Sequence, residues 1–141
     1  MIVKIKTSCK LPRYQTPGSS GMDIHASLEE PIWLFEDAVP TLIPTGLFME
    51  IPCGYEAQIR SRSGLAMDGI VVQNSPGTVD SDYRGEIKVM LKNTGGPAYR
   101  IQPLDRIAQI VFAPVERVRF EEVEELYSTK RGSYGFGSTG K

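Results

Sequence analysis

The stretch of the 141-residue sequence richest in chemically active side chains is NSPGTVDSDYRGEIKV, residues 74–89. Pro76–Gly77 predicts a turn, and the residues on either side are expected to form the arms of a hairpin. On an extended arm, Asp80 and Asp82 face the same side and Tyr83 faces the other. A carboxylate beside a phosphate can hold and deprotonate a water, so the pattern predicts a general base. A surface turn rich in Asp and Gly is the alternative interpretation.

A second candidate site is RSRSGLA, residues 60–66. Arg60 and Arg62 alternate along a predicted strand, so they project to the same side and can meet phosphate oxygens. The following SGLAMD predicts a short helix with Ser63 as its N-cap, where Gly64 lets a ligand approach free backbone N–H groups. These groups together predict a phosphate site. Taken alone, they also fit a solvated basic strand end with a capping serine.

Two further stretches carry isolated polar residues. SSGMDIHA, residues 19–26, contains Asp23, which alone is typical of a turn, and the sole histidine, His25. No Ser or Cys nucleophile lies near His25 in sequence, so we assign it no role. In DRIAQIVF, residues 105–112, Gln109 interrupts an apolar strand and either faces solvent or reaches a specific partner.

The chain ends in RGSYGFGSTGK, residues 131–141. Its glycines lie beside Ser138 and Thr139, and successive backbone N–H groups in such a segment can wrap around an anion. The segment lacks the G-x-x-x-x-G-K-[ST] pattern, so it is not that type of nucleotide-binding loop. Taken alone, it is equally typical of a frayed terminus.

The elements that position these residues are predicted to be short strands. Fourteen glycines and ten prolines separate segments of period-two alternation, namely VKIK, YEAQIR, EIKVML and RIAQIVF. This pattern predicts an all-β sandwich or barrel. PVERVRFEEVEELY, residues 114–127, fits helical and strand spacing, and in an all-β context we expect a strand followed by a connecting segment.

Composition limits the classes of protein. The length fits one domain, and 40% hydrophobic and 23% charged residues are typical of a globular protein without a membrane span. Sixteen basic and 17 acidic side chains give a net charge of −1, which offers no general attraction to nucleic acid. Cys9 and Cys53 have no metal or redox spacing, and MIVKIKTSCK is no signal peptide. We therefore expect a cytoplasmic protein that binds neither membrane nor nucleic acid.

All five stretches occur in one chain, and in this the sequence resembles the trimeric dUTPases, or deoxyuridine 5′-triphosphate nucleotidohydrolases. The matching strings are SGMDIHA, RSRSGLA, GTVDSDYRGE, RIAQIVFAPV and RGSYGFGSTG. The resemblance implies a jelly-roll-like, β-clip fold with one short helix, in a homotrimer that exchanges C-terminal tails and shares active sites between subunits. It also implies Mg²⁺-assisted hydrolysis of dUTP to dUMP and pyrophosphate, which keeps uracil out of DNA and supplies dUMP for thymidylate synthesis.

The resemblance also implies roles for individual residues. Asp80 matches the carboxylate that activates the water attacking the α-phosphorus. Asp23 matches one that places Mg²⁺ through coordinated waters, the metal being held mainly by the triphosphate. Tyr83 matches the ring that packs under the deoxyribose and leaves no room for a 2′-hydroxyl. The other implied substrate-binding residues are Arg62, Ser63, Gly64 and Gln109 on the phosphates, Asn74, Gly77, Thr78, Val79 and Lys88 in the segment that grips uracil, Arg131 on the γ-phosphate, Phe136 on uracil, and Gly137, Ser138 and Thr139 on the phosphates.

On this basis residues 1–130 are expected to form the β-rich domain and residues 131–141 a flexible lid. Ser61 stands where the family commonly has proline, and Tyr134 stands where it commonly has glycine. The segment after RSGLA is one residue shorter than usual. Two alternatives stay open: a dCTP deaminase on the same fold, with or without dUTPase activity, and a non-catalytic dUTP-sensing regulator.

Overall fold

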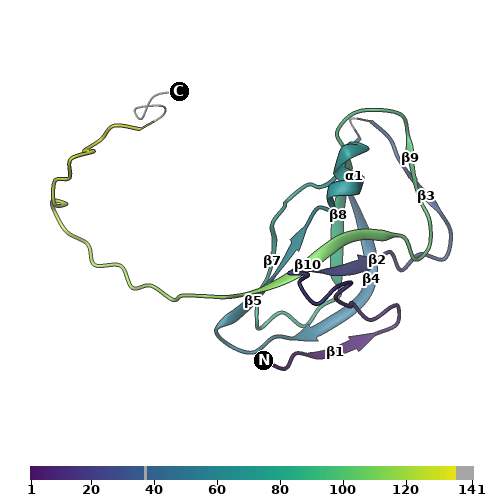
Figure 1. Cartoon of the computed structure of the whole chain (residues 1–141), viewed down its shortest axis with the longest axis horizontal. Coiled ribbons are helices and arrows are strands. Elements are labelled where there is room, and N and C mark those ends of the chain that lie inside the picture. The colour runs from purple at the N-terminus through teal and green to yellow at the C-terminus, as the bar shows by residue number, and fades with distance from the viewer. Residues whose placement is uncertain (37, 136–141) are drawn as a thin grey trace.

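The structure is a computed structural model that describes residues 1–36 and 38–135, and it is built almost entirely of β-strands (Figure 1). The elements are β1 (Lys4–Thr7), β2 (Met22–His25), β3 (Ile32–Leu34), β4 (Thr41–Glu50), β5 (Tyr55–Arg60), α1 (Ser63–Met67), β6 (Ile70–Val72), β7 (Gly77–Val79), β8 (Ile87–Asn93), β9 (Tyr99–Ile101) and β10 (Arg106–Pro114). The prediction of an all-β chain with one short helix is confirmed. In the described part of the chain, no helix is long and apolar enough to cross a membrane.

The strands form two four-stranded antiparallel sheets and one small two-stranded sheet. One large sheet has the order β1-β4-β8-β6, and the other has the order β2-β10-β5-β7. The third sheet pairs β3 with β9. β1 and β7 are therefore edge strands, and each leaves half of its backbone hydrogen-bonding groups without a strand partner.

The two large sheets enclose one hydrophobic core. Alternation along β8 and β5 turns every second side chain inward, which is the period-two pattern that the sequence shows. The largest fully buried apolar side chains are Ile24, Ile43, Leu47, Ile70, Leu91, Ile101, Ile107 and Ile110. They come from both large sheets and from β9. Burial of each contributes about 1.5–3 kcal/mol, so this shared core holds the sheets together.

A bulge in β4 shifts its register against β8 between Pro44 and Leu47. Gly46 within the bulge has a φ of 68°, and a Cβ there would lie 3.3 Å from the backbone nitrogen of Cys9. Both the positive φ and the close approach require glycine. Thr45 and Gly46 in the bulge donate to Glu86 in the loop that follows β7, and that loop also carries Asp80 and Tyr83.

The predicted hairpin in residues 74–89 is wrong. β6 pairs with β8 in one sheet, whereas β7 pairs with β5 in the other. The chain therefore crosses from one sheet to the other and back, and no two of these strands form the arms of a hairpin around Pro76–Gly77. Residues 80–86 form a connecting loop at the edge of the sandwich.

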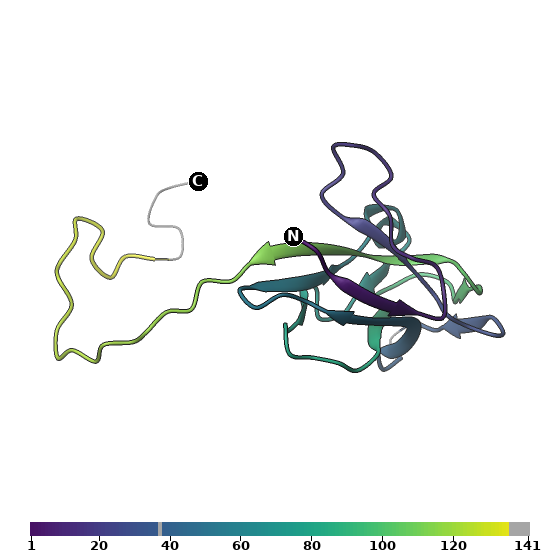
Figure 2. The same cartoon turned by 90° about the horizontal axis from the view of Figure 1, so that it is seen from below.

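Residues 115–135, which we call the C-terminal arm, contain no helix or strand. β10 ends at Pro114, so the connecting segment predicted within 114–127 is confirmed, but the strand expected around Val118 and Phe120 is absent. The arm runs away from the sandwich in both side views (Figure 1, Figure 2). Its side chains are exposed.

Candidate functional site

A pocket of about 490 Å³ lies between the end of β7 and the start of β8, and we call it the Asp80 pocket. Its lining residues are Leu42, Thr78, Val79, Asp80, Tyr83, Glu86, Ile87 and Lys88. Five of them are predicted site residues. The volume falls in the range of small-molecule sites, so the pocket can hold a nucleoside.

Tyr83 lines the same pocket as Asp80 rather than facing the opposite side. The strand ends at Val79, and the amide of Tyr83 donates to the carbonyl of Asp80 over 3.2 Å, which closes a turn. The Tyr83 hydroxyl donates to the carbonyl of Glu86 over 3.0 Å. The expectation from strand alternation was wrong because the chain leaves the extended conformation at Asp80.

Asn74 and Gly77 lie beside this pocket and do not line it. A Cβ on Gly77 would lie 2.8 Å from Nδ2 of Asn74, so the amide packs directly on the Gly77 backbone. Gly77 is buried, while Asn74 is exposed. Asn74 is thus a side chain that supports the start of β7.

A second group of polar residues, the arginine–aspartate cluster, consists of Asp23, Arg62 and Arg106. Nε of Arg62 donates to Asp23 over 2.9 Å, and Nη1 of Arg106 donates to the other carboxylate oxygen over 3.2 Å. Nη1 of Arg62 also donates to the carbonyl of Arg106 over 2.9 Å. The Asp23 side chain is only 11% exposed, so this pairing offsets the cost of burying its charge. Asp23 lies within β2 and not in the turn that its local sequence indicates.

Gln109 lies at the same end of the sandwich as this cluster. It is opposite Asp23 in one strand pair and opposite Arg60 in the other. Its Nε2 donates to the carbonyl of Ser61 over 3.0 Å, and a Cβ on Gly21 would lie 2.6 Å from its Oε1. Gln109 therefore reaches specific partners, one of the two possibilities that the sequence left open.

The helix start at Ser63 and Gly64 is exposed, as a phosphate site requires. The N-cap is Arg62 and no side chain caps the helix, so the prediction that Ser63 is the N-cap is wrong. A Cβ on Gly64 would meet nothing within 4 Å, which leaves open space above the backbone. The Ser61 hydroxyl accepts from the amide of Val72 over 2.8 Å. This bond fixes the segment that leads into the helix, although no proline is present there.

His25 follows the arginine–aspartate cluster on β2 and stays without a role. Its Nδ1 is buried and has no hydrogen-bond partner among the described residues. Burial lowers the pKa of His25, and the positive charges of Lys10, Arg106 and Arg62 lower it further against the opposing effect of Asp23. The imidazole is therefore neutral at pH 7.

The Asp80 pocket and the arginine–aspartate cluster lie at opposite ends of β5. Val79 is opposite Ala57, so Asp80 continues toward the first residues of β5 and lines a small pocket with Glu56. Arg62 lies two residues beyond the other end of β5. From Glu56 to Arg62 the chain advances about 20 Å at ~3.3 Å per residue. A triphosphate is shorter than this backbone separation.

Arg131 lies in the C-terminal arm and is exposed. Its Nε donates to the carbonyl of Tyr134 over 2.9 Å, and the amide of Tyr134 donates to the carbonyl of Arg131 over 3.2 Å. These bonds close a local turn. The other predicted tail residues, Phe136, Gly137, Ser138 and Thr139, lie outside the described residues.

Sequence reasoning missed four residues that the structure places at the two sites, namely Leu42, Glu86, Ile87 and Arg106. Leu42 comes from β4, far away in sequence, and nothing in its own neighbourhood marks it. Arg106 lies in the stretch that drew attention to Gln109, but it contacts Asp23 across 83 residues of sequence, which no local pattern indicates. Glu86 lies within the string DYRGE, and the turn that precedes it places it in the wall of the Asp80 pocket.

Comparison with known proteins points to one family. The dUTPase family model matches residues 7–140 of the chain. A deoxyuridine 5′-triphosphate nucleotidohydrolase of Fusobacterium nucleatum is 54% identical over 133 residues, which cover 94% of this chain and 90% of that protein. The protein of that name from Chlamydia trachomatis is 52% identical over 140 residues, 98% of this chain and 96% of its own. The one from Cytophaga hutchinsonii is 56% identical over 137 residues, which cover 96% of this chain and 88% of that protein.

Solved structures agree with these sequence relatives. The dUTPase of Staphylococcus bacteriophage 80alpha with dUPNHPP superimposes with a TM-score of 0.89 at 26% identity, covering 99% of both chains. The G164S mutant of that protein with dUpNHpp gives a TM-score of 0.88 at 25% identity, again over 99% of both chains. The predicted dUTPase fold is thereby confirmed. Since the family model spans nearly the whole chain and three relatives exceed half identity over nearly all of it, the chain belongs to the dUTPase family.

Proposed function

We propose that the protein hydrolyses dUTP to dUMP and pyrophosphate, as its relatives named deoxyuridine 5′-triphosphate nucleotidohydrolase do. The observation that carries this function is the joint lining of one nucleoside-sized pocket by Asp80 and Tyr83. A carboxylate supplies a base and an aromatic ring supplies a platform for a sugar. A pocket that served only packing would not be expected to contain both groups.

Asp80 is the general base in this mechanism. Its side chain is exposed at the pocket, where it can hold a water and accept a proton from it. The water oxygen forms a bond to the α-phosphorus while the bond from that phosphorus to the bridging oxygen breaks. Pyrophosphate leaves with the electron pair of the broken bond. Positioning and charge stabilisation supply most of the rate, as in other phosphoryl transfers.

The triphosphate is held by Arg62, Gln109 and the helix start at Ser63 and Gly64. Asp23 and the carbonyl of Arg106 fix the guanidinium of Arg62 by two of its N–H groups. A guanidinium has five N–H donors, so others are free to bind phosphate oxygens. The open space above Gly64 lets phosphate oxygens approach backbone N–H groups.

The donor set fits Mg²⁺ that arrives with the substrate. Among the described residues there is no group of three or more His, Cys, Asp or Glu side chains that could hold a metal alone. Each Asp23 oxygen accepts from an arginine and keeps a further lone pair for a metal-bound water. Mg²⁺ typically keeps several waters and binds substrate phosphates with one or two carboxylates. When bound, it would neutralise triphosphate charge and orient the phosphates.

The nucleobase uracil is recognised at the edge of β7. This strand pairs only with β5 in its sheet, so the backbone groups of Thr78 and Val79 on its free side can pair with the edge of uracil. Cytosine would leave such groups unpaired, which is a strong ground for rejection. Tyr83 lies under the deoxyribose in this arrangement and excludes a 2′-hydroxyl, and Lys88 lines the same pocket.

The active site is completed between subunits of a homotrimer. Asp80 and Arg62 of one chain lie at opposite ends of β5, so Asp80 must act with Arg62 of the partner subunit. The C-terminal arm supports exchange between subunits, because Phe120 is 96% exposed and Leu126 is 88% exposed. Apolar side chains so exposed on an extended segment gain from a surface on another copy.

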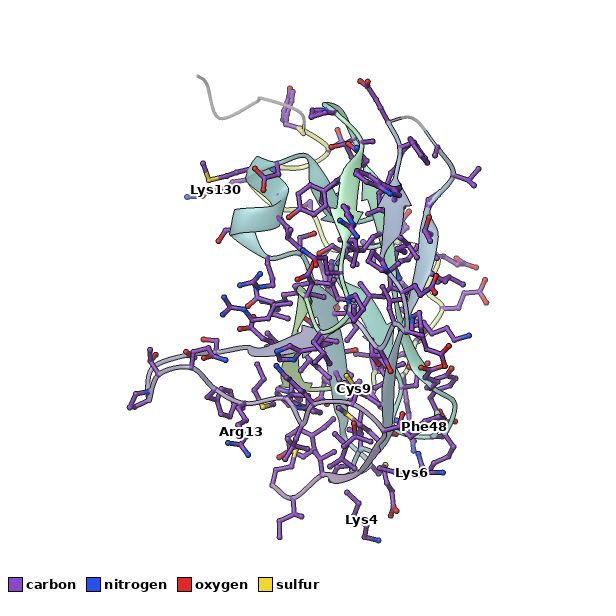
Figure 3. All side chains as sticks on the ribbon, turned by 90° about the vertical axis from the view of Figure 1, so that its right-hand side faces the viewer. Lys4, Lys6, Cys9, Arg13, Phe48 and Lys130 are labelled. Atoms are coloured by element: carbon purple, nitrogen blue, oxygen red, sulfur yellow. The ribbon has the colours of Figure 1, made fainter. Side chains whose placement is uncertain are left out.

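Charge also supports an exchanged arm. Lys4 and Lys6 project from the edge strand β1, at the end of the molecule where Phe48 lies, with Nζ of Lys6 5.3 Å from the centroid of that ring (Figure 3). The arm carries the acidic run EEVEE at residues 121–125. An edge strand with basic side chains and an acidic extended segment are complementary.

The remaining assignments complete the proposal. Residues 1–130 form the catalytic domain, and residues 131–141 close over the bound nucleotide, with Arg131 on the γ-phosphate, Phe136 on uracil, and Gly137, Ser138 and Thr139 on the phosphates. Cys9 and Cys53 are free thiols, which supports a reducing compartment, and we place the protein in the cytoplasm. We propose no nucleic-acid or membrane partner.

Initial rates on dUTP, dCTP, dTTP and UTP with Mg²⁺ test the function directly. We expect pyrophosphate release from dUTP to exceed that from each of the others by at least about 100-fold, because the pocket selects both base and sugar. Release of ammonia from dCTP would instead indicate a deaminase.

Replacement of the general base Asp80 tests the mechanism. Asp80→Asn keeps the shape of the side chain but cannot accept a proton, so dUTP hydrolysis should fall by about 10³-fold. Binding of a non-hydrolysable dUTP analogue, measured by calorimetry, should stay within about threefold. Asp68→Asn, the same substitution at an exposed residue after α1, is the control and should turn over normally. Undiminished turnover by Asp80→Asn would disprove the mechanism.

Mixing two inactive variants tests the shared site. Asp80→Asn and Arg62→Ala chains with different tags are co-expressed, and trimers carrying both tags are isolated. Every trimer that carries both tags has both intact residues at one of its three sites, so about a third of wild-type activity should return. Trimers of Asp80→Asn chains with both tags serve as the blank. Mixed trimers as inactive as this blank would show that Asp80 and Arg62 act within one chain.

Truncation tests the lid. Removal of residues 131–141 should lower dUTP turnover roughly 100-fold, because the phosphates lose contacts that fix them for attack. The midpoint of thermal unfolding should move by less than about 2 °C, since the arm adds no strand to the core. A truncated protein with full activity would exclude a lid.

A further inference from the structure

Glu86 joins the loop that carries Tyr83 to the bulge in β4. Its Oε1 accepts from the amide of Thr45 over 3.2 Å and from the amide of Gly46 over 2.9 Å. Two backbone N–H groups converge on one carboxylate oxygen because the bulge and the positive φ of Gly46 turn both amides the same way. Charge-assisted hydrogen bonds of this kind are about twice as strong as neutral ones.

The same residue also holds the phenol ring. The Tyr83 hydroxyl donates to the backbone carbonyl of Glu86 over 3.0 Å, and a Cβ on Gly85 would lie 2.6 Å from Cζ of Tyr83. The ring therefore lies directly on the backbone at Gly85. The backbone at Gly85 determines the position of the ring in the pocket, and the side chain of Glu86 fixes this backbone to β4.

We propose that Glu86 is a positioning residue for sugar selectivity: it fixes the Tyr83 ring where it excludes a 2′-hydroxyl. This inference rests on the proposed function, in which Tyr83 packs under the deoxyribose. Glu86 does not act as a base or as a phosphate ligand. Its carboxylate is occupied by the two amides, and Nζ of Lys88 lies 3.9 Å from its other oxygen.

The alternative is that Glu86 only stabilises the loop, and this role predicts a different effect on the kinetics. If Glu86 only stabilised the loop, its loss would lower the reaction of dUTP and of UTP by the same factor. If it positions Tyr83, its loss lets the ring retreat and makes room for the 2′-hydroxyl. The ratio of kcat/KM for dUTP to that for UTP then falls, which a structural role does not change.

The experiment measures kcat and KM on dUTP and UTP for wild type, Glu86→Ala, Glu86→Gln, Tyr83→Ala and the double variant Glu86→Ala/Tyr83→Ala. We expect Glu86→Ala to lower the dUTP-to-UTP ratio about tenfold, chiefly through a rise in kcat/KM for UTP, because the retreating ring makes room for the 2′-hydroxyl. Glu86→Gln keeps an acceptor oxygen for the amides and should restore the ratio to within about threefold of wild type. Glu29→Ala, at an exposed glutamate, is the control.

The double variant decides whether Glu86 acts through the ring. In the Tyr83→Ala background, Glu86→Ala should leave the ratio unchanged, because there is no ring left to position. An equal further fall in both backgrounds would overturn the proposal, and so would an unchanged ratio in Glu86→Ala. If Glu86→Ala fails to assemble, Glu86→Asp, whose carboxylate is one methylene further from the amides of Thr45 and Gly46, takes its place; a lowered ratio supports the proposal and a wild-type ratio overturns it.

The proposed function and this inference fail in different ways. A wild-type enzyme that hydrolyses dUTP and UTP equally would remove the sugar role of Tyr83 and, with it, the role of Glu86. A wild-type enzyme that selects dUTP and depends on Tyr83, but whose selectivity is indifferent to Glu86, would leave the proposed function intact and refute the inference alone.

Discussion

The pairing of β7 along β5 is the constraint on which the candidate site depends. It places Val79 opposite Ala57, so Asp80 leaves the sheet at one end of β5 while Arg62 and the helix start follow its other end. Backbone hydrogen bonds fix this register, and a slip of one residue would turn buried side chains outward. The separation of base and phosphate ligands is thus built into the sheet. The proposed site shared between subunits rests on this separation, because a second copy of the chain would bring the missing half.

Electrostatics follow the same division. With a net charge of −1 the chain has no general attraction for a highly charged anion, so binding depends on local groups. Asp23 lies between Arg62 and Arg106 and keeps both guanidiniums ordered near the helix start. This acidic residue lowers the local positive charge, yet it pre-organises the donors and leaves a place for a metal-bound water. In the proposed mechanism, Mg²⁺ bound with the substrate would supply much of the charge balance that the protein alone lacks.

Local patterns predicted four of the ten strands that the structure describes, namely β1, β5, β8 and β10, because period-two alternation is a property of each segment by itself. YEAQIR coincides with β5, and RIAQIVF lies within β10. They failed where pairing with a distant strand decides the structure: residues 74–89 resemble a hairpin, yet β7 pairs with β5 in one sheet, whereas β8 pairs with β4 and β6 in the other. Leu42 and Arg106 enter the sites through contacts between distant segments, which no local signal records. The apolar side chains in residues 115–127 remain exposed in the part of the chain that the structure describes.

Gly46 and Gly85 show why sugar selectivity is difficult to recognise from the sequence. Gly46 has a positive φ, so its backbone conformation alone favours glycine. Gly85 has an ordinary φ, and glycine is needed there because the Tyr83 ring lies on its backbone. A requirement set by a neighbouring ring is visible only once both are placed. Excluding a 2′-hydroxyl demands that the ring stay within a fraction of an ångström, which a side chain on a loop cannot achieve alone. In the proposed arrangement, the hydrogen bonds from the amides of Thr45 and Gly46 to Glu86 would supply that rigidity, because they connect the loop to the bulge in β4.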